Sequence, residues 1–184
     1  MRIIAGSARG LPLKAPPTRA TRPTSDRVRE SLFGLIESSA ANWDAVLDLY
    51  AGSGALGIEA LSRGAGWADF VESQRAACAA IRENLSRARL ADRARVICRP
   101  VDRALPELNR RYDIILLDPP YADAQRDAIL ARLARSPLLT GQSLVVVEHS
   151  RHHPVIEAYP PLHLTKQRRY GDTLISIFEQ GESS

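Results

Sequence analysis

The sequence predicts an α/β fold in which helices cover both faces of a doubly wound, mostly parallel β-sheet. After Trp43, short apolar runs of strand length alternate with helical patterns, which is typical of repeated βα units. The chain has 184 residues, enough for one domain, and its 45% hydrophobic and 25% charged residues are ordinary for a globular protein. No stretch approaches the roughly 18 consecutive apolar residues of a membrane helix, so no membrane association is expected.

The chain before Trp43 is expected to form a hairpin, an extended linker and a helix. Two apolar patches around a Ser-Ala-Arg-Gly turn predict a β-hairpin in residues 2–15, and the proline-rich stretch 15–25 predicts a linker. Apolar positions on one face predict a helix over residues 26–38. We therefore divide the chain into a basic extension, residues 1–24, and a main domain, residues 25–184.

The main domain is expected to contain a seven-stranded sheet. Five strands belong to the βα units, at residues 45–50, 67–72, 94–99, 112–118 and 143–149. The helices between them are predicted at residues 54–64, 75–90, 103–110 and 124–135. The last two strands, 162–169 and 173–180, should form an antiparallel hairpin at one edge of the sheet.

Basic residues are concentrated at the start of the chain. Residues 1–30 contain seven Arg or Lys and two acids, whereas the whole chain has a net charge of only +4. A basic extension on a nearly neutral body suggests a polyanionic partner, because phosphate neutralisation supplies most of the sequence-independent affinity for nucleic acids. A solubilising arm is the alternative interpretation.

A glycine-rich turn joins the first predicted strand to the helix after it. Gly52, Gly54 and Gly57 follow G-x-G-x-x-G spacing, which allows a tight turn and a close approach of a ligand to the start of the helix. Glu72 ends the next strand, where a carboxylate can accept hydrogen bonds from ribose hydroxyls. The pattern predicts a nucleotide or nucleoside ligand; a turn that serves packing alone is the alternative.

Asp48 helps to distinguish two such ligands. A dinucleotide would bring a pyrophosphate to the glycine turn, and an acid just before the turn would repel it. S-adenosylmethionine (SAM) has no phosphate and carries a sulfonium and an ammonium group, which a carboxylate tolerates or attracts. The D-x-Y-x-G-x-G pattern beginning at Asp48 therefore favours SAM.

The motif Asp118-Pro119-Pro120-Tyr121 follows an apolar strand, at the sheet edge where ligands of open α/β sheets bind. The Asp118 carboxylate and the Pro119 carbonyl can each accept an N–H bond from an exocyclic amine. The nitrogen lone pair would then face a methyl donor. The prolines keep the turn rigid, and the Tyr121 ring can stack on a base, which contributes roughly 1–3 kcal/mol. Methyl transfer to a base amine is expected; a simple strand-ending turn is the alternative.

Several segments together resemble the bacterial RsmD-type 16S rRNA guanine-N2 methyltransferase family, which is part of the class I SAM-dependent methyltransferases. The matching segments are "MRIIAG", "RPTSDRVRESLF", "VLDLYAGSGALGIEALSRGA", "FVE", "LLDPPY" and "RRYGD", and they cover essentially the whole chain. The resemblance implies a Rossmann-like SAM-dependent methyltransferase fold with an added N-terminal β-hairpin. It also implies methylation of the N2 amine of a guanine in 16S rRNA, within a partly or fully assembled small ribosomal subunit.

The resemblance also assigns residues by position. Cofactor binding falls to Asp48, Ala51, Gly52, Ser53, Gly54, Glu72 and Asp102. The target amine falls to the catalytic group Asp118, Pro119, Pro120 and Tyr121. The resemblance places Arg22, Thr24 and Arg27 near the site as candidates for RNA contacts. The charge pattern, independently of the resemblance, adds the basic residues Arg2, Arg9, Lys14 and Arg19 of the extension and Arg169 of the basic segment 166–170, for which a solvated face is the alternative.

Other features predict less. Cys78 and Cys98 have no metal-ligand spacing and are interpreted as buried thiols in a reducing cytoplasm. His149, His152 and His153 have ligand-like spacing, but no further Cys or His supports a metal, so a solvated loop and no metal site are expected. The N-terminus becomes polar too soon for a signal peptide. A monomer is expected.

Three other functions compete with this interpretation. An adenine-N6 methyltransferase acting on DNA or RNA would use the same Asp-Pro-Pro-Tyr motif. An NAD-dependent oxidoreductase would use the glycine turn but would leave Asp118 and the basic extension without a role. A catalytically idle RNA-binding module would have little use for the acid of the motif.

Overall fold

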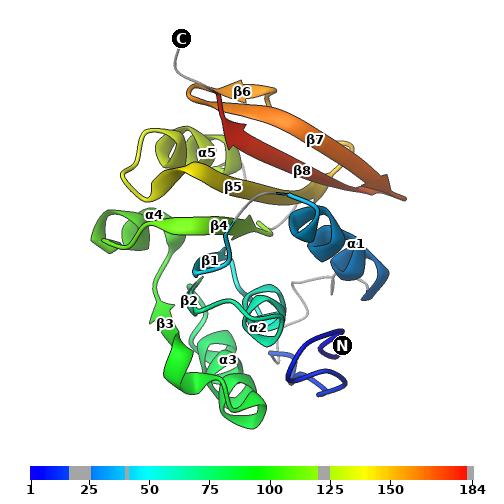
Figure 1. Ribbon diagram of the computed structural model, residues 1–184. Coiled ribbons are helices and arrows are strands. Elements are labelled where there is room, and N and C mark those ends of the chain that lie inside the picture. Colours follow the sequence, from blue (N-terminus) through cyan, green and yellow to red (C-terminus); the bar gives the residue numbers. More distant parts are fainter. Residues whose placement is uncertain (17–25, 40–41, 120–124, 182–184) are drawn as a thin grey trace.

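A computed structural model of the chain describes residues 1–16, 26–39, 42–119 and 125–181. Within these ranges the strands form one eight-stranded mixed sheet in the order β3-β2-β1-β4-β5-β8-β7-β6 (Figure 1). Strands β1 to β5 run parallel to one another, and β8, β7 and β6 continue the sheet in antiparallel pairing. The predicted α/β class and its C-terminal hairpin are confirmed.

The elements lie close to the predicted positions. The strands are β1 (Ala45–Leu49), β2 (Trp67–Glu72), β3 (Ala94–Cys98), β4 (Tyr112–Leu117), β5 (Leu139–Ser150), β6 (Ala158–Tyr159), β7 (Leu162–Tyr170) and β8 (Thr173–Gln180). The helices are α1 (Asp26–Glu37), α2 (Ala55–Ser62), α3 (Arg75–Ala88), α4 (Val101–Ala104) and α5 (Arg126–Ala134), with 3-10 turns η1 (Ala91–Arg93) and η2 (Leu105–Glu107). The two-residue strand β6 was not predicted, and it raises the strand number from seven to eight in the described chain.

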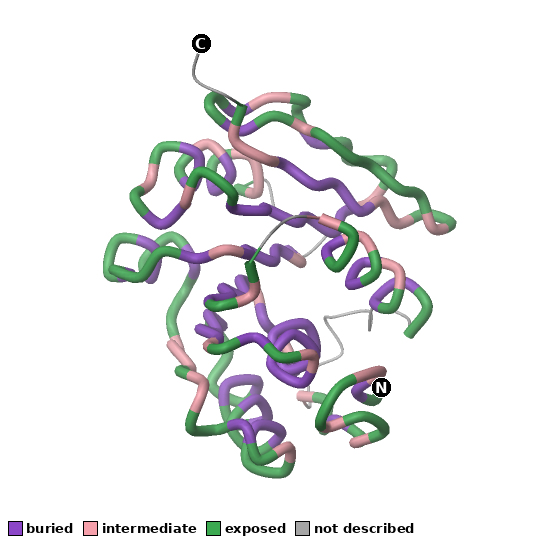
Figure 2. The backbone as a smooth tube through the Cα atoms, in the orientation of Figure 1, coloured by how far each residue is buried: buried purple, intermediate pink, exposed green. Residues whose placement is uncertain are grey.

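The central strands of the sheet are buried between two hydrophobic clusters. Figure 2 shows these strands in the colour of buried residues. On one face α1, α2 and α3 pack against alternate residues of the strands, among them Val46 and Ile114. On the other face α4, η2 and α5 pack against the intervening residues, among them Leu47 and Ile115. Parallel strands buried on both faces read as continuous apolar runs, which is why they could be located from the sequence.

The start of the chain forms a short hairpin, although only one β-bridge, between Arg2 and Pro12, is regular. The Ile3 amide donates to the Leu11 carbonyl at 3.0 Å, and the Leu13 amide donates to the Met1 carbonyl at 3.0 Å. Ile3 and Leu13 are buried in the same cluster as α1 and α2, so the hairpin shares the core of the main domain. The predicted boundary at residues 24 and 25 lies outside the described residues.

None of the helices in the described ranges is long and apolar enough to cross a membrane.

Candidate active site

The register of the sheet aligns the carboxyl ends of β1, β2 and β4, which carry the glycine turn and two of the predicted site acids. Leu49 at the end of β1 pairs with Val71 of β2 on one side and with Leu117 of β4 on the other. The next residues along these three neighbouring strands are Tyr50, Glu72 and Asp118. The acid of the Asp-Pro-Pro-Tyr motif and the acid predicted to bind ribose therefore flank the start of the glycine turn.

The glycine turn depends on unusual backbone angles. Gly52 and Gly54 have φ angles of 55° and 78°, in the left-handed region that glycine enters without a steric penalty. The Gly54 amide donates to the Ala51 carbonyl at 2.7 Å, which closes the turn immediately before α2. Tyr50 also has a positive φ, 61°, which is uncommon for a residue with a side chain.

The third glycine of the motif serves packing. A Cβ atom on Gly57 would lie 2.4 Å from the Phe70 ring and 3.0 Å from Oδ2 of Asp48, so a side chain cannot fit. The Gly57 amide instead donates to Asp48 Oδ2 at 2.8 Å. Asp48 is 1% exposed, and it lies on the β1 face that packs against α2. Its carboxylate holds the first turn of α2 against the strand.

Burial changes the ionisation of Asp48. Removal of the carboxylate from water raises its pKa from 3.8 to about 7, the Gly57 hydrogen bond opposes this rise, and the charge of Glu72 adds to it. A cation bound at the sheet edge would counteract both effects that raise the pKa. This electrostatic setting suits the predicted role of Asp48 in attracting a cationic ligand, although its carboxylate lies beneath the turn.

The Glu72 carboxylate accepts hydrogen bonds from the glycine turn and from the start of α3. Its Oε2 accepts the Gly52 amide at 2.9 Å, and its Oε1 accepts the Gln74 amide at 2.8 Å. The Ser73 hydroxyl also donates to Oε1, at 3.4 Å. Because a carboxylate offers about four lone-pair sites, Oε2 retains accepting capacity for a further hydrogen bond. Glu72 can therefore orient the glycine turn and still bind hydroxyl groups of a ligand.

A cavity of about 100 Å³ opens beside Glu72. Its lining residues come from the ends of β1 and β2, from the start of α4 and from the residue before α5: Tyr50, Val71, Glu72, Ser73, Pro100, Val101, Asp102 and Gln125. Glu72 and Asp102 can accept hydrogen bonds from ribose hydroxyl groups, and the apolar and aromatic residues beside them can contact a base. The chemistry of the cavity therefore fits a nucleoside. The volume is below the about 300–1,000 Å³ of usual ligand pockets, so the cavity suits one part of such a ligand.

Two predicted cofactor residues, Glu72 and Asp102, meet in this cavity. Ala51, Gly52, Ser53 and Gly54 form the adjoining turn and do not line it. The other six lining residues were missed: Tyr50, Val71, Ser73, Pro100, Val101 and Gln125. Tyr50 stands inside the D-x-Y-x-G pattern, so its place in the motif was the available signal.

A larger cavity, of about 630 Å³, lies between η2 and α5. Its walls are mainly apolar, with Leu105, Leu108 and Leu138 among them, and Arg132 and Arg135 are its charged residues. It contains neither the predicted acids nor the glycine turn. We therefore assign the site to the smaller cavity at the sheet edge.

Of the predicted catalytic motif, the structure describes Asp118, which is half-buried, and Pro119, which is buried. Pro120 and Tyr121 lie outside the described residues. Leu117 pairs with Val147 of β5, so the next residue of β5, the buried acid Glu148, stands beside Asp118. Glu148 was not predicted as a site residue, although it is the acid at the end of the apolar run of β5.

The start of α5, which follows the motif in the chain, is held by side-chain hydrogen bonds. Arg126, the first residue of α5, donates to the His153 and Pro154 carbonyls at 2.8 Å each. Asp127 accepts the Tyr159 hydroxyl at 2.7 Å. These bonds attach the start of α5 to the segment after β5 and to β6.

The predicted RNA-binding residues that the structure describes are all exposed: Arg2, Arg9, Lys14, Arg27 and Arg169. Arg2 and Arg9 line a polar cavity of about 260 Å³ between the hairpin and α1, which also contains Asp26 and Glu30. Arg19, Arg22 and Thr24 lie outside the described residues.

The predicted RNA-binding residue of β7, Arg169, lies near α1. Arg169 precedes Tyr170, whose hydroxyl contacts the Ser31 hydroxyl of α1. Ser31 is one helical turn from Arg27. This contact brings the β7–β8 hairpin to the helix that carries Arg27.

The remaining sequence features have structural roles. Cys78 is buried, donates to the Glu72 carbonyl at 3.3 Å and has its pKa raised to about 12 by burial, and Cys98 is partly buried. Burial lowers the pKa of His149, whose Nε2 lies 2.8 Å from the Ser176 hydroxyl. His149 is thus part of the sheet and not of a solvated loop, whereas His152 and His153 are exposed. No cluster of metal-ligating side chains occurs among the described residues.

Known proteins resemble the chain over nearly its whole length. A family model described as conserved hypothetical protein 95 matches residues 1–179. The chain is 37% identical to the candidate rRNA methyltransferase YlbH of Bacillus subtilis over 183 residues, covering 98% of this chain and 99% of that protein. It is 33% identical over 188 residues to the ribosomal RNA small subunit methyltransferase D of Escherichia coli K12, with 100% and 93% covered. The structure of an Escherichia coli candidate methyltransferase, yhhF, superposes with a TM-score of 0.82 at 31% identity, covering 98% and 97% of the two chains.

Proposed function

This chain belongs to the RsmD-type methyltransferase family, and we propose that it transfers a methyl group from SAM to the N2 amine of a guanine in 16S rRNA. Methylation of ribosomal RNA is the activity in the names of its relatives. The observation that carries the proposal is the placement of Asp118 and Glu72 on either side of Tyr50 at one sheet edge. This arrangement puts a group for the target amine next to a group for the cofactor.

The cofactor side would be held by the glycine turn and its surroundings. Glu72 would accept hydrogen bonds from the ribose hydroxyls while it fixes the Gly52 amide. Val71 and Val101 would provide apolar contacts for the adenine, and Asp102 would lie beside it. When bound, SAM supplies a methyl group on a positively charged sulfur, and Asp48 would favour that charge from beneath the turn.

The amine side would be held by the Asp118 motif. An exocyclic amine is a weak nucleophile because its lone pair is delocalised into the ring. The Asp118 carboxylate and the Pro119 carbonyl would each accept one N–H bond and so favour a pyramidal nitrogen with its lone pair facing the methyl group. The nitrogen would form its new bond to the methyl carbon as the methyl–sulfur bond breaks and S-adenosylhomocysteine leaves, and the methylated nitrogen would then lose one proton to water. Alignment would supply most of the rate enhancement, since proximity can contribute about 7–11 kcal/mol.

The RNA would lie along the exposed basic residues of the hairpin, of α1 and of the β7–β8 turn. These residues are separated in sequence but are joined through α1, because the hairpin carbonyl of Arg2 accepts Arg29 Nη2 at 2.7 Å and Tyr170 contacts Ser31. Extruding the target base from a helix costs a few kcal/mol, which stacking on Tyr121 would help to offset. A substrate in a partly or fully assembled small subunit is part of the proposal.

The test is methylation of small ribosomal subunits from a strain that lacks the activity, with radiolabelled SAM and identification of the modified nucleoside. N2-methylguanosine is expected. N6-methyladenosine would replace the proposed target with adenine, and absence of transfer to RNA would refute an rRNA substrate.

The same assay tests the role of Asp118. Asp118→Ala should abolish methyl transfer while S-adenosylhomocysteine (SAH) still binds, because the carboxylate contacts the amine and not the cofactor. Asp92→Ala, which removes an exposed acid of η1, is the matched control and should leave transfer unchanged. Retained turnover in Asp118→Ala would show that another group presents the amine.

A further inference from the structure

A buried side-chain amide joins the N-terminal hairpin, residues 1–14 (the basic hairpin), to the glycine turn. Asn84, on α3, is 0% exposed. Its Oδ1 accepts the Lys14 amide at 2.8 Å, and its Nδ2 donates to the Lys14 carbonyl at 3.0 Å. Its Nδ2 also donates to the Ser53 carbonyl at 3.0 Å. One side chain thus holds both backbone groups of Lys14 and, at the same time, the backbone of the cofactor turn.

The orientation of this amide is fixed by its neighbours. Two carbonyl groups require both hydrogens of Nδ2, and one N–H group requires the oxygen, so a flipped amide would lose all three bonds. Ser53 stands between Gly52 and Gly54, the two glycines with left-handed backbone angles. Asn84 therefore bonds to the segment whose conformation the cofactor site depends on.

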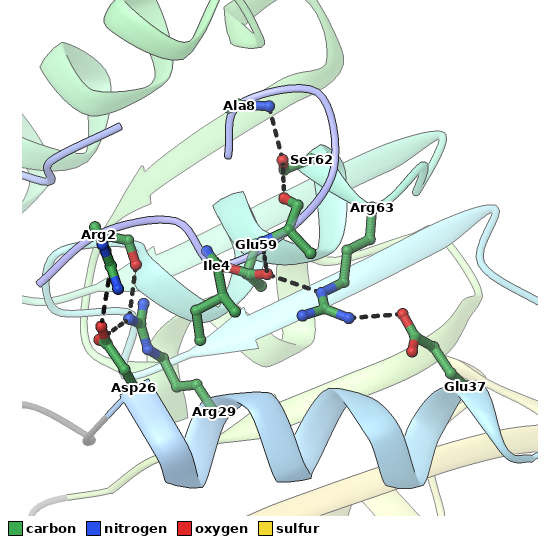
Figure 3. Close-up of polar contacts among 10 residues, drawn as sticks. Arg2, Ile4, Ala8, Asp26, Arg29, Glu37, Glu59, Ser62 and Arg63 are labelled. Atoms are coloured by element: carbon green, nitrogen blue, oxygen red, sulfur yellow. Dashed lines mark hydrogen bonds and ion pairs between the residues drawn. The ribbon is translucent and has the colours of Figure 1, made fainter. Parts of the chain in front are cut away.

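The other side-chain contacts of the hairpin go to α2, the helix that follows the glycine turn. The buried carboxylate of Glu59, on α2, accepts the Ile4 amide at 2.7 Å and the Ala5 amide at 3.0 Å (Figure 3). The Ser62 hydroxyl accepts the Ala8 amide at 2.9 Å and donates to the Ala5 carbonyl at 2.6 Å. The hairpin is thus attached to α2 and α3, the two helices that pack beside the turn, but only Asn84 among these residues bonds to both the hairpin and the turn.

We propose that Asn84 is a positioning residue that couples RNA binding at the basic hairpin to cofactor binding at the glycine turn. This inference rests on the proposed rRNA methyltransferase function. The coupling needs two arrangements, one with the Lys14 backbone paired to Asn84 and one in which this end of the hairpin is open to water. RNA bound along the hairpin favours the paired arrangement. Asn84 then holds Ser53 in the form that receives the cofactor.

The coupling is reciprocal. A ligand that favours the paired arrangement strengthens the binding of the other ligand by the same factor. The protein without RNA should therefore bind SAH more weakly than the protein saturated with RNA, and the protein without SAH should bind RNA more weakly. Typical coupling factors are about 5–150-fold, so an effect of at least about fivefold is expected.

The experiment measures the SAH dissociation constant by calorimetry, with and without saturating small subunits from a strain that lacks the activity. The variant is Asn84→Asp, which keeps the Oδ1 acceptor but replaces both donated hydrogen bonds with a carboxylate facing two carbonyl oxygens. We expect RNA to tighten SAH binding at least about fivefold in the unaltered protein and by a factor near 1 in Asn84→Asp.

Two control variants separate this role from general effects. Asn109→Asp makes the same change at an exposed position. Glu83→Ala removes the exposed ion pair with Lys14 Nζ without touching Ser53. Both should keep the coupling factor of the unaltered protein, whereas a loss in Glu83→Ala equal to that in Asn84→Asp would move the coupling to the ion pair and overturn the proposal.

A second measurement needs no substitution. In the unaltered protein without cofactor, RNA should slow amide hydrogen exchange in the peptides that contain Ser53. Unchanged exchange there, a coupling factor of 1 in the unaltered protein, or full coupling in Asn84→Asp would each overturn the role of Asn84. A protein that binds small subunits but methylates no RNA would instead refute the proposed function, so the two failures are distinguishable.

Discussion

Asp48→Asn should remove a pH-dependent loss of stability that the folded protein carries. Burial raises the pKa of Asp48 from 3.8 to about 7. Between these two pH values the unfolded chain ionises Asp48 while the folded chain keeps it protonated. The folded state therefore binds more protons, and its stability falls as pH rises through this range. Above pH 7 both states are ionised and the loss is complete.

The magnitude follows from the width of this range. Each pH unit between the two pKa values is equivalent to about 1.36 kcal/mol, so the full loss is about 4 kcal/mol. Between pH 5 and pH 8 the unaltered protein should lose about 3 kcal/mol through Asp48, and Asp48→Asn should lose none of it. The asparagine also changes the local hydrogen bonds, but that contribution is the same at both pH values and cancels.

The assay is urea denaturation of both proteins at several pH values without cofactor. The difference in unfolding free energy, Asp48→Asn minus the unaltered protein, should grow by about 3 kcal/mol from pH 5 to pH 8. Asp44→Asn makes the same change at an exposed position four residues earlier and should show a constant difference. A difference for Asp48→Asn that stays constant within about 0.5 kcal/mol would mean that Asp48 is ionised in the folded protein throughout, and the electrostatic description of the turn would be wrong.

Two further substitutions test the turn. Gly57→Ala should destabilise the fold by about 1–3 kcal/mol because its methyl group would meet the Phe70 ring, whereas Gly34→Ala, in open space on α1, should be neutral or slightly stabilising. Urea denaturation measures both, and equal stabilities would contradict the close contact. Glu72→Gln should weaken SAH binding by about 10- to 100-fold, since charge-assisted hydrogen bonds contribute about 1.5–3 kcal/mol, while Glu83→Gln on the surface should not. Calorimetry decides, and unchanged affinity would remove Glu72 from the cofactor site.

Most of the fold could be predicted because its signals are local. The apolar runs of β1, β4 and β5 and the glycines after β1 mark a parallel sheet and its ligand edge in the sequence itself. Glu72 and Asp118 could be placed at that edge for the same reason, because Glu72 is the last residue of β2 and Asp118 is the first residue after β4. The register then brings them together without any further information.

Other parts of the site depend on contacts that no local pattern indicates. Asn84 reads as an ordinary polar residue of a helix, yet it bonds to Lys14, 70 residues earlier, and to Ser53. Glu59 lies inside an apolar helix, where it pairs with Arg63 and also accepts hydrogen bonds from backbone amides that are 54 and 55 residues away. Asp48 could be located but its hydrogen bond to Gly57 could not, because the sequence does not show which face of β1 receives α2.

The attachment of the hairpin to α2 and α3 also orders events during synthesis of the chain on a ribosome. The hairpin emerges before its partners, since Glu59 follows Ile4 by 55 residues and Asn84 follows Lys14 by 70 residues. At about 5–20 residues per second, the partner of Lys14 is added about 4–14 s after Lys14 itself. Until α3 is made, Ile3 and Leu13 lack part of the cluster that buries them. The hairpin is therefore synthesised before its partners but can reach its final place only after α3 has been made.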